Sequence, residues 1–215
     1  MKLLGLNNVV VLSPHPDDAE YSISATVSKY YDTTFHILTM SNGGNYDDTV
    51  FDNRDGEARR FWSLNHNVEF HSSLDLSSGF LSESKEDLLV HRVESIMSTL
   101  TIDAVFAPPQ LDSHFEHRLI NNVGRAVCRI DRISLIEYHT PSTMNTWTAN
   151  FYVSVDDHVT AKKRRLRDIF KSQATKHYFS NKALDAFHSD YFCEKRGVGA
   201  VEKYRIDSLF DSADV

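Results

Sequence analysis

The sequence predicts an α/β fold, a Rossmann-like three-layer sandwich with a mostly parallel sheet. Short apolar runs bounded by turn residues alternate with helical patterns through the first two thirds of the chain, and this alternation is typical of βαβ units. Two of the apolar runs end in clusters of histidine and carboxylate side chains. Because the ligands of open α/β sheets bind outside the carboxyl ends of the strands, we expect an active site at that edge of the sheet.

The apolar runs are the predicted strands, because continuous apolar stretches of this length are typical of strands buried on both faces. They span residues 8–12, 34–40, 68–70, 102–107 and 134–138, with an edge strand at 151–155. Apolar residues at helical spacing lie between them, most clearly at residues 85–100, where they fall on one face. The other predicted helices span residues 19–31, 52–64, 118–129 and 159–172.

Beyond residue 172 the pattern is weak, and no element is predicted there. The sequence has no internal repeat, no long Gly/Ser linker and no shift in composition that would mark a second domain. A chain of 215 residues with 41% hydrophobic content can bury one sizeable core. We therefore predict a single domain over residues 1–215.

The charge balance excludes some classes of partner. The chain carries 30 acidic and 23 basic residues, a formal charge of −7, whereas binding to nucleic acid or anionic membranes requires a basic surface. The basic run at residues 162–167 is interpreted as a solvated helix face. Two cysteines without CxxC spacing indicate a reducing compartment, and no apolar run approaches the ~20 residues that span a bilayer. We predict a cytoplasmic protein that acts on a small molecule, as a monomer or a homo-oligomer.

The first polar cluster follows the strand predicted at residues 8–12. Residues 14–20 read Pro-His-Pro-Asp-Asp-Ala-Glu. Pro16 suits the first position of a helix, where a missing N–H costs nothing, so Asp17 and Asp18 are predicted in the first turn, with His15 at the cap. Backbone N–H groups and the positive end of the helix dipole gather at such a point. Two of these side chains can hold a divalent metal and leave the third for chemistry.

The second cluster follows the strand predicted at residues 102–107. Its carboxylates and histidines are Asp112, His114, Glu116 and His117. Because His114 and His117 are three residues apart, one helical turn can project both toward the same point. If the two clusters follow neighbouring strands of one parallel sheet, their side chains converge.

The combined clusters offer the ligands of a catalytic metal. Three protein ligands and an open position are usual for catalytic zinc, and His15, Asp18 and His117 supply such a set. Asp17 then remains free to take a proton from the attacking water, whose pKa a bound metal lowers toward ~7.

Each cluster also has a simpler interpretation. A histidine pair on a helix is more often a surface or capping pair, and Asp-Asp after proline is a common signal for a helix start. The coincidence of two such clusters, each at the end of an apolar strand, favours a site. The other histidines have no partner at ligand spacing along the sequence and are interpreted as structural or surface residues. They are His36, His66, His71, His91, His139, His158, His177 and His188.

Residues 14–20, with residues 106–117, resemble the LmbE-like or PIG-L-type zinc-dependent N-deacetylases. Weaker similarity lies at residues 38–43, 54–58 and 74–79. The resemblance implies that His15, Asp18 and His117 are zinc ligands and that Asp17 is the general base. The sequence departs from the family pattern at Phe115, which replaces proline, and at residues 24–25, where Ser-Ala stands near an expected Gly-Gly pair.

The resemblance also implies roles around the metal. It implies that His114 stabilises the oxyanion or protonates the leaving amine, and that Arg54 and Asp75 contact the substrate. Glu116 stands where the family has aspartate, so we expect it to orient His114. Glu116 or Asp112 would then keep His114 protonated, because a nearby carboxylate raises the pKa of a histidine.

The sequence therefore predicts a zinc-dependent hydrolase that removes an N-acetyl group from an amino sugar or a GlcNAc-containing conjugate. One zinc ion per chain is expected, and another divalent metal would fit the same ligands. Two alternatives stay open at this point: an amidase that acts on a non-sugar N-acyl substrate, and a non-catalytic metal- or sugar-binding module. The presence of Asp17, which is not needed as a ligand, favours turnover over binding alone.

Overall fold

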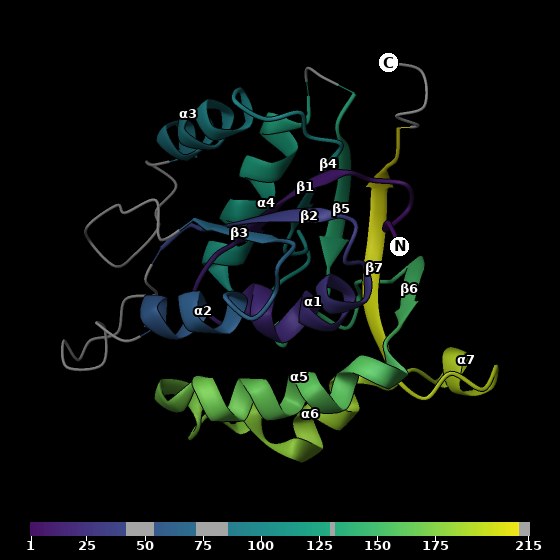
Figure 1. Ribbon diagram of the computed structural model, residues 1–215. Helices are drawn as coiled ribbons and strands as arrows, with labels where there is room; N and C mark the ends of the chain where they lie inside the picture. The colour runs from purple at the N-terminus through teal and green to yellow at the C-terminus, as the bar shows by residue number, and fades with distance from the viewer. Residues whose placement is uncertain (42–53, 72–85, 130–131, 211–215) are drawn as a thin grey trace.

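The computed structural model describes residues 1–41, 54–71, 86–129 and 132–210. Within these residues the chain forms a seven-stranded sheet in the order β3-β2-β1-β4-β5-β7-β6 (Figure 1). The strands are β1 (Asn8–Ser13), β2 (Thr34–Thr39), β3 (Val68–His71), β4 (Ala104–Ala107), β5 (Ser134–Tyr138), β6 (Phe151–Ser154) and β7 (Val201–Ser208). Strands β1 to β5 pair in parallel, and β7 runs antiparallel to both of its neighbours. The predicted α/β class with a mostly parallel sheet is confirmed.

Helices cover both faces of the sheet (Figure 1). One face carries α1 (Asp18–Lys29) and α2 (Arg54–Trp62), with α5 (Asp156–Ile169) packed against both of them. The other face carries α3 (Glu86–Met97) and α4 (Phe115–Val127). The C-terminal third adds the short elements η3 (Lys171–Gln173), η4 (His177–Phe179), α6 (Asn181–His188) and α7 (Tyr191–Glu194).

The position of β1 in the middle of the sheet, with helices on both faces, explains why its sequence is a continuous apolar run. Val9 and Val11 pack into the core on the α1 face, whereas Val10 and Leu12 pack into the core on the α3–α4 face. Successive side chains of a strand point to opposite faces, so a strand covered on both sides needs apolar residues at every position.

Both polar clusters stand at the topological switch point of the sheet. From β1 the chain proceeds to β2 and β3 on one side, and β4 begins the other half of the sheet beside β1. The crevice outside the carboxyl ends of two such strands is where open α/β sheets bind ligands. Residues 14–20 follow β1 and residues 112–117 lead from β4 into α4, so the fold brings the two clusters together.

The sequence prediction missed strand β7 and misjudged part of helix α5. Strand β7 alternates charged and apolar residues, and its buried positions include the carboxylate of Glu202. Glu202 forms an ion pair with Lys162, the first residue of the basic run, and Lys162 is buried rather than solvated. The hydropathy pattern predicts both residues to be exposed, because they are charged. Their burial is tolerated because the two charges pair with each other, and this pairing joins distant segments of the chain. Strand β6 lies at the sheet edge, as expected.

No helix in the described parts of the chain is long and apolar enough to cross a membrane. The single-domain organisation and the cytoplasmic location stay predictions.

Close packing of α4 on the sheet gives a test of the fold. A Cβ added to Gly124 would lie 3.0 Å from the Cβ of Ala107 on β4, and neither backbone can give way easily. We expect Gly124→Ala to lower the free energy of unfolding by about 1–2 kcal/mol, because overpacking outweighs the better helix propensity of alanine. Chemical denaturation measures this change.

Asn122→Ala is the matched control, because Asn122 is exposed on the same helix and its replacement improves helix propensity without a clash. Equal or higher stability of Gly124→Ala relative to Asn122→Ala would contradict the close contact of α4 with β4.

Candidate metal centre

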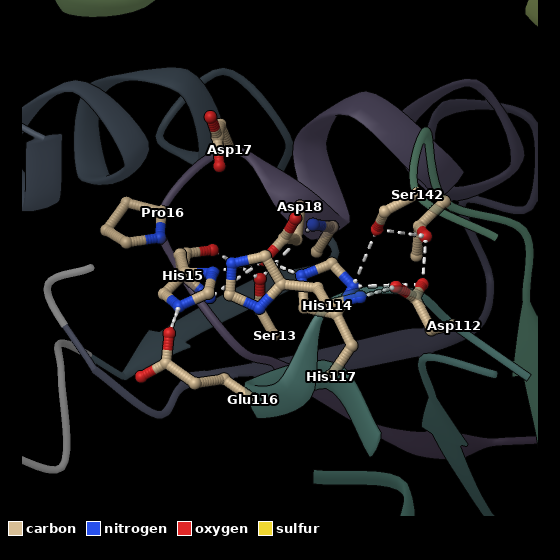
Figure 2. A network of polar contacts seen from close by, with 12 residues as sticks. Ser13, His15, Pro16, Asp17, Asp18, Asp112, His114, Glu116, His117 and Ser142 are labelled. Atoms are coloured by element: carbon tan, nitrogen blue, oxygen red, sulfur yellow. Dashed lines mark hydrogen bonds and ion pairs between the residues drawn. The ribbon is translucent and has the colours of Figure 1, made fainter. Parts of the chain in front are cut away.

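The turn between β1 and α1 separates two adjacent carboxylates. Helix α1 begins at Asp18, and Asp17 is its N-cap with φ 120° and ψ −25°. The predicted placement of Asp17 inside the first turn is therefore wrong. Its backbone N–H donates to a Glu20 carboxylate oxygen at 2.9 Å, and the Trp62 indole donates to the other oxygen at 2.6 Å. Because Asp17 is not helical, its side chain and that of Asp18 point in different directions (Figure 2).

His15, Asp18 and His117 converge on one point, as the sequence predicts. One donor atom from each residue lies within 4.8 Å of the others, and all three residues are buried. Asp18 Oδ2 lies 3.0 Å from His15 Nδ1 and 3.2 Å from His117 Nε2 (Figure 2). Ligand atoms of a tetrahedral zinc site lie about 3.4 Å apart, so the donor set and its spacing fit a divalent metal.

The far nitrogen of each histidine is held by a carboxylate. His15 Nε2 lies 2.7 Å from a Glu116 oxygen, and His117 Nδ1 lies 3.1 Å from an Asp112 oxygen. The same Asp112 oxygen accepts a 2.5 Å hydrogen bond from the Thr140 hydroxyl. Carboxylates in this position orient the ring of a metal-bound histidine and raise its basicity. The Glu116 carboxylate contacts His15, and donor atoms of Glu116, His15 and His114 lie within 4.8 Å of one another, so the orientation of His114 by Glu116 stays a prediction.

The histidines and carboxylates of this cluster shift one another's pKa values. Burial lowers the pKa of His15, but hydrogen bonds to Asp18 and Glu116 outweigh burial and raise it to about 9. Burial likewise lowers the pKa of His117, and Asp18 and Asp112 raise it to about 10. Burial raises the pKa of Asp18, yet His117 and His15 hold it well below its usual value. The carboxylates thus impose a negative potential that favours a cation between the rings.

Asp17 points away from this network (Figure 2), and it lines the cavity beside the network. Its carboxylate accepts a hydrogen bond from the Arg54 guanidinium at 3.0 Å and one from the Tyr178 hydroxyl at 3.3 Å. Burial raises the pKa of Asp17 to about 6, although the nearby charge of Arg54 opposes this shift. A carboxylate with a pKa near neutrality is well suited to accept a proton.

His114 lies next to both candidate histidine ligands. Its ring stacks on His117 with centroids 4.7 Å apart and meets the His15 ring edge-on at 5.1 Å. Partial burial and the charges of His117 and His15 lower the pKa of His114, contrary to the expectation that a carboxylate would keep it protonated. Asp112 accepts a hydrogen bond from the backbone N–H of His114 at 2.7 Å, so this carboxylate fixes the backbone of His114.

A cavity of about 380 Å³ opens beside the three converging residues. The C-terminal part of the chain contributes Pro141, Ser142, Gln173, Lys176 and Tyr178 to its lining. None of these five residues was predicted as a site residue, because they lie in polar, turn-rich segments where the hydrophobic pattern is weak. Arg54 lines the cavity as well, but its guanidinium binds Asp17 and the carbonyl oxygen of Pro16. Asp75, the other predicted substrate contact, lies outside the described residues.

Together, the sheet order and the buried cluster define an α/β protein with a candidate metal centre at the switch point. Within this class, residues 10–128 match the PIG-L family, described as GlcNAc-PI de-N-acetylase. The match covers more than half of the 215-residue chain, so the chain belongs to this family. The resemblance inferred from two short motifs is confirmed, and with it the prediction of an N-deacetylase of this family. No match was found among curated protein sequences.

Solved structures with different activities share the fold. N,N'-diacetylchitobiose deacetylase from Pyrococcus horikoshii is 19% identical, with a TM-score of 0.68 over 94% of this chain and 84% of that one. A zinc-inhibited teicoplanin deacetylase is 14% identical, with a TM-score of 0.69 over 92% and 97% of the two chains. GalB, the 4-carboxy-2-hydroxymuconate hydratase from Pseudomonas putida KT2440, is 10% identical, with a TM-score of 0.71 over 97% and 99%. At these identities the likeness shows the fold, which carries more than one reaction.

The contact of Asp112 with His117 gives a test of the metal centre. We expect Asp112→Asn to weaken metal binding about 10–100-fold, because loss of such a carboxylate lowers the affinity of the histidine it holds. Titration of the metal-free protein with Zn²⁺ measures the affinity. Ser113→Ala serves as the control, since Ser113 is exposed and its hydroxyl donates to the Ser142 carbonyl. Unchanged affinity in Asp112→Asn would show that this carboxylate does not support a metal ligand.

Proposed function

We propose that the protein is a zinc-dependent hydrolase that removes an N-acetyl group from an amino sugar or a GlcNAc-containing conjugate. One observation carries the proposal. Asp17 is a buried carboxylate outside the His15, Asp18 and His117 cluster, it faces the same cavity, and its pKa is raised to about 6. A buried carboxylate with a pKa shifted toward neutrality, facing the cavity beside a metal-binding cluster, is typical of a catalytic acid or base and favours turnover over binding alone.

His15, Asp18 and His117 would hold the zinc ion, since two imidazoles and one carboxylate are a common catalytic donor set. When bound, zinc polarises a carbonyl group and lowers the pKa of water toward ~7. Glu116 and Asp112 would keep the two histidine rings in place through the contacts at 2.7 Å and 3.1 Å.

Asp17 would accept the proton of the attacking water. Its Oδ1 and Oδ2 atoms each receive a hydrogen bond, from Arg54 and Tyr178 respectively, so the carboxylate is held in one orientation. Each carboxylate oxygen has a second lone pair, and one of them can receive the proton. The Arg54 charge moderates the shift in pKa and keeps the base ionised near neutral pH.

His114 would stabilise the negative charge that develops on the acetyl oxygen. Its ring lines the cavity beside the cluster, and His114 is exposed whereas His15 and His117 are buried. With a lowered pKa the ring is neutral, and a neutral imidazole still offers one N–H donor. A donor in such a position is often a large contributor to catalysis of acyl transfer.

The substrate class rests on three lines of support. The family is described as GlcNAc-PI de-N-acetylase, and deacetylases that act on diacetylchitobiose and in teicoplanin synthesis share the fold. The cavity of about 380 Å³ is within the usual range for small-ligand sites. Ser142, Gln173 and Lys176 line it, and these side chains can form hydrogen bonds with sugar hydroxyls.

Acetate release from a panel of substrates tests the proposal. Zinc-loaded protein is incubated with N-acetylglucosamine, N,N'-diacetylchitobiose, a GlcNAc-inositol conjugate and simple N-acetyl amides without a sugar. Release from the sugars alone supports the proposal, and release only from the non-sugar amides supports an amidase instead. Binding of sugar without release would indicate a binding module. The fold shared with GalB makes an unsaturated carboxylate a useful negative control.

Asp17→Asn tests the general base. The amide keeps the shape of the side chain but cannot accept a proton, so we expect turnover to fall by roughly 10²–10⁴. Metal content should stay near that of the wild type, because Asp17 is not one of the three converging residues. Elemental analysis and an acetate-release assay check both points, and wild-type turnover in Asp17→Asn would eliminate Asp17 as the base.

The neighbouring histidines should respond differently to replacement. We expect His114→Ala to lower kcat by about 10²–10³, the loss typical of one oxyanion donor, while metal content is retained. We expect His117→Ala to lose the metal, because His117 supplies one of three ligands. Equal metal loss in both variants would identify His114 as a ligand and contradict this division of roles.

A further inference from the structure

A second group of histidine and carboxylate side chains lies on strands β2 and β3, apart from the cavity described above. It consists of His36, Glu69 and His71, and one donor atom from each lies within 4.8 Å of the others. His36 pairs with Glu69 in the register of the two strands, and His71 is two residues farther along β3. Since alternate residues of a strand face the same side of a sheet, the three side chains share one face.

Three ring nitrogens of this group lack hydrogen-bond partners among the described residues. His36 is 2% exposed, and both of its ring nitrogens are among them. His71 Nε2 is also buried and has no hydrogen-bond partner among the described residues. His36 Nδ1 lies 3.2 Å from a Glu69 oxygen, without the geometry of a hydrogen bond. Burying polar atoms without partners is unfavourable and rare in native proteins, so these nitrogens require an explanation.

A histidine is unusual at position 36, because the neighbouring side chains belong to the apolar core. It pairs with Val10 across β1 and β2, and Val10 and Leu38 belong to the core on the α3–α4 face. An apolar residue would serve packing alone at this position. The rings of His36 and His71 lie with centroids 6.0 Å apart and tilted by 36°, and ring packing of this kind gives the buried ring nitrogens no hydrogen-bond partner.

We propose that His36, Glu69 and His71 form a second metal site that binds Zn²⁺ or a similar divalent transition metal. Two imidazoles and one carboxylate are ligands that these metals prefer. The 3.2 Å between His36 Nδ1 and the Glu69 oxygen is close to the spacing of about 3.4 Å between zinc ligands. A metal ion would provide the partner that the buried nitrogens lack.

A metal ion bound at this site would stabilise the edge of the sheet. Strand β3 is the terminal strand and β2 is its neighbour within the sheet, so an ion held by both cross-links the edge. Edge strands expose unpaired backbone groups and are prone to wrong pairings. The Glu69 side chain is 61% exposed, which gives the ion a route from solvent. The two candidate sites share no residue, so replacing a residue of the second removes no ligand from the first.

Counting zinc ions in variants tests the second site. Metal-free protein is titrated with Zn²⁺ by calorimetry, and bound zinc is measured by elemental analysis after dialysis. We expect two ions per chain in the wild type, one in His71→Gln, one in His117→Ala, and none in the double variant. Glu69→Gln should weaken the second site about 10–100-fold or more, since even outer-shell changes have effects of this size.

Matched controls separate a built site from nonspecific zinc binding. His91 is exposed and pairs with the half-buried Glu94 on α3, with the nitrogen and oxygen 3.7 Å apart, so His91→Gln and Glu94→Gln should leave both ions in place. Zinc should also raise the Tm of His117→Ala, because a ligand of the folded state stabilises it. This rise should be absent from His117→Ala/His71→Gln.

The proposal is wrong if His71→Gln and Glu69→Gln bind as much zinc as the wild type, with unchanged affinity. It is also wrong if His91→Gln reduces binding equally. Glu69→Gln alters an exposed side chain and keeps the test valid if replacement of a histidine disturbs folding. Deacetylase activity of zinc-loaded His71→Gln should match the wild type, which separates failure of this site from failure of the proposed function.

Discussion

The backbone of Asp17 is the constraint on which the rest of the site depends. A non-glycine residue with φ 120° is strained by about 1–3 kcal/mol, and Glu20 offsets that strain by accepting its backbone N–H. The turn points the side chains of two consecutive aspartates in different directions, so they make different contacts. Asp18 contacts both histidines of the metal centre, whereas Asp17 faces the cavity and binds Arg54. A regular helical turn through both residues would not separate them in this way.

The candidate metal centre also depends on how closely two halves of the sheet meet. His15 and Asp18 follow β1, and His117 comes from α4, which follows β4. Register between β1 and β4 and the close approach of Gly124 to Ala107 therefore set the distance between these three side chains. Asp112 reinforces this geometry, since it contacts the His117 ring and the His114 backbone. Stability of α4 and affinity for metal should be linked for this reason.

Local sequence was sufficient where one strand or one turn carries the signal. The apolar run of β1 and the two polar clusters predicted the sheet and the residues that converge. Contacts between distant segments could not be predicted: Tyr178 reaches Asp17 from η4, and Glu116 contacts the ring of His15. The same limit applies to His36 and His71, which were interpreted as structural residues because they are far apart along the chain and meet only through strand pairing.

The C-terminal third connects helix α1 and Asp17 to the lining of the cavity. Glu202 on β7 accepts hydrogen bonds from the backbone N–H groups of Ala25 and Thr26 in α1 and pairs with Lys162 of α5. Tyr21 of α1 donates to the carbonyl oxygen of Tyr178, whose hydroxyl binds Asp17. The helix that follows Asp17 is thus tied to the segment that lines the cavity. Because Gln173, Lys176 and Tyr178 of this segment line the cavity, substitutions there would change the shape and polarity of the cavity without altering the β1 turn.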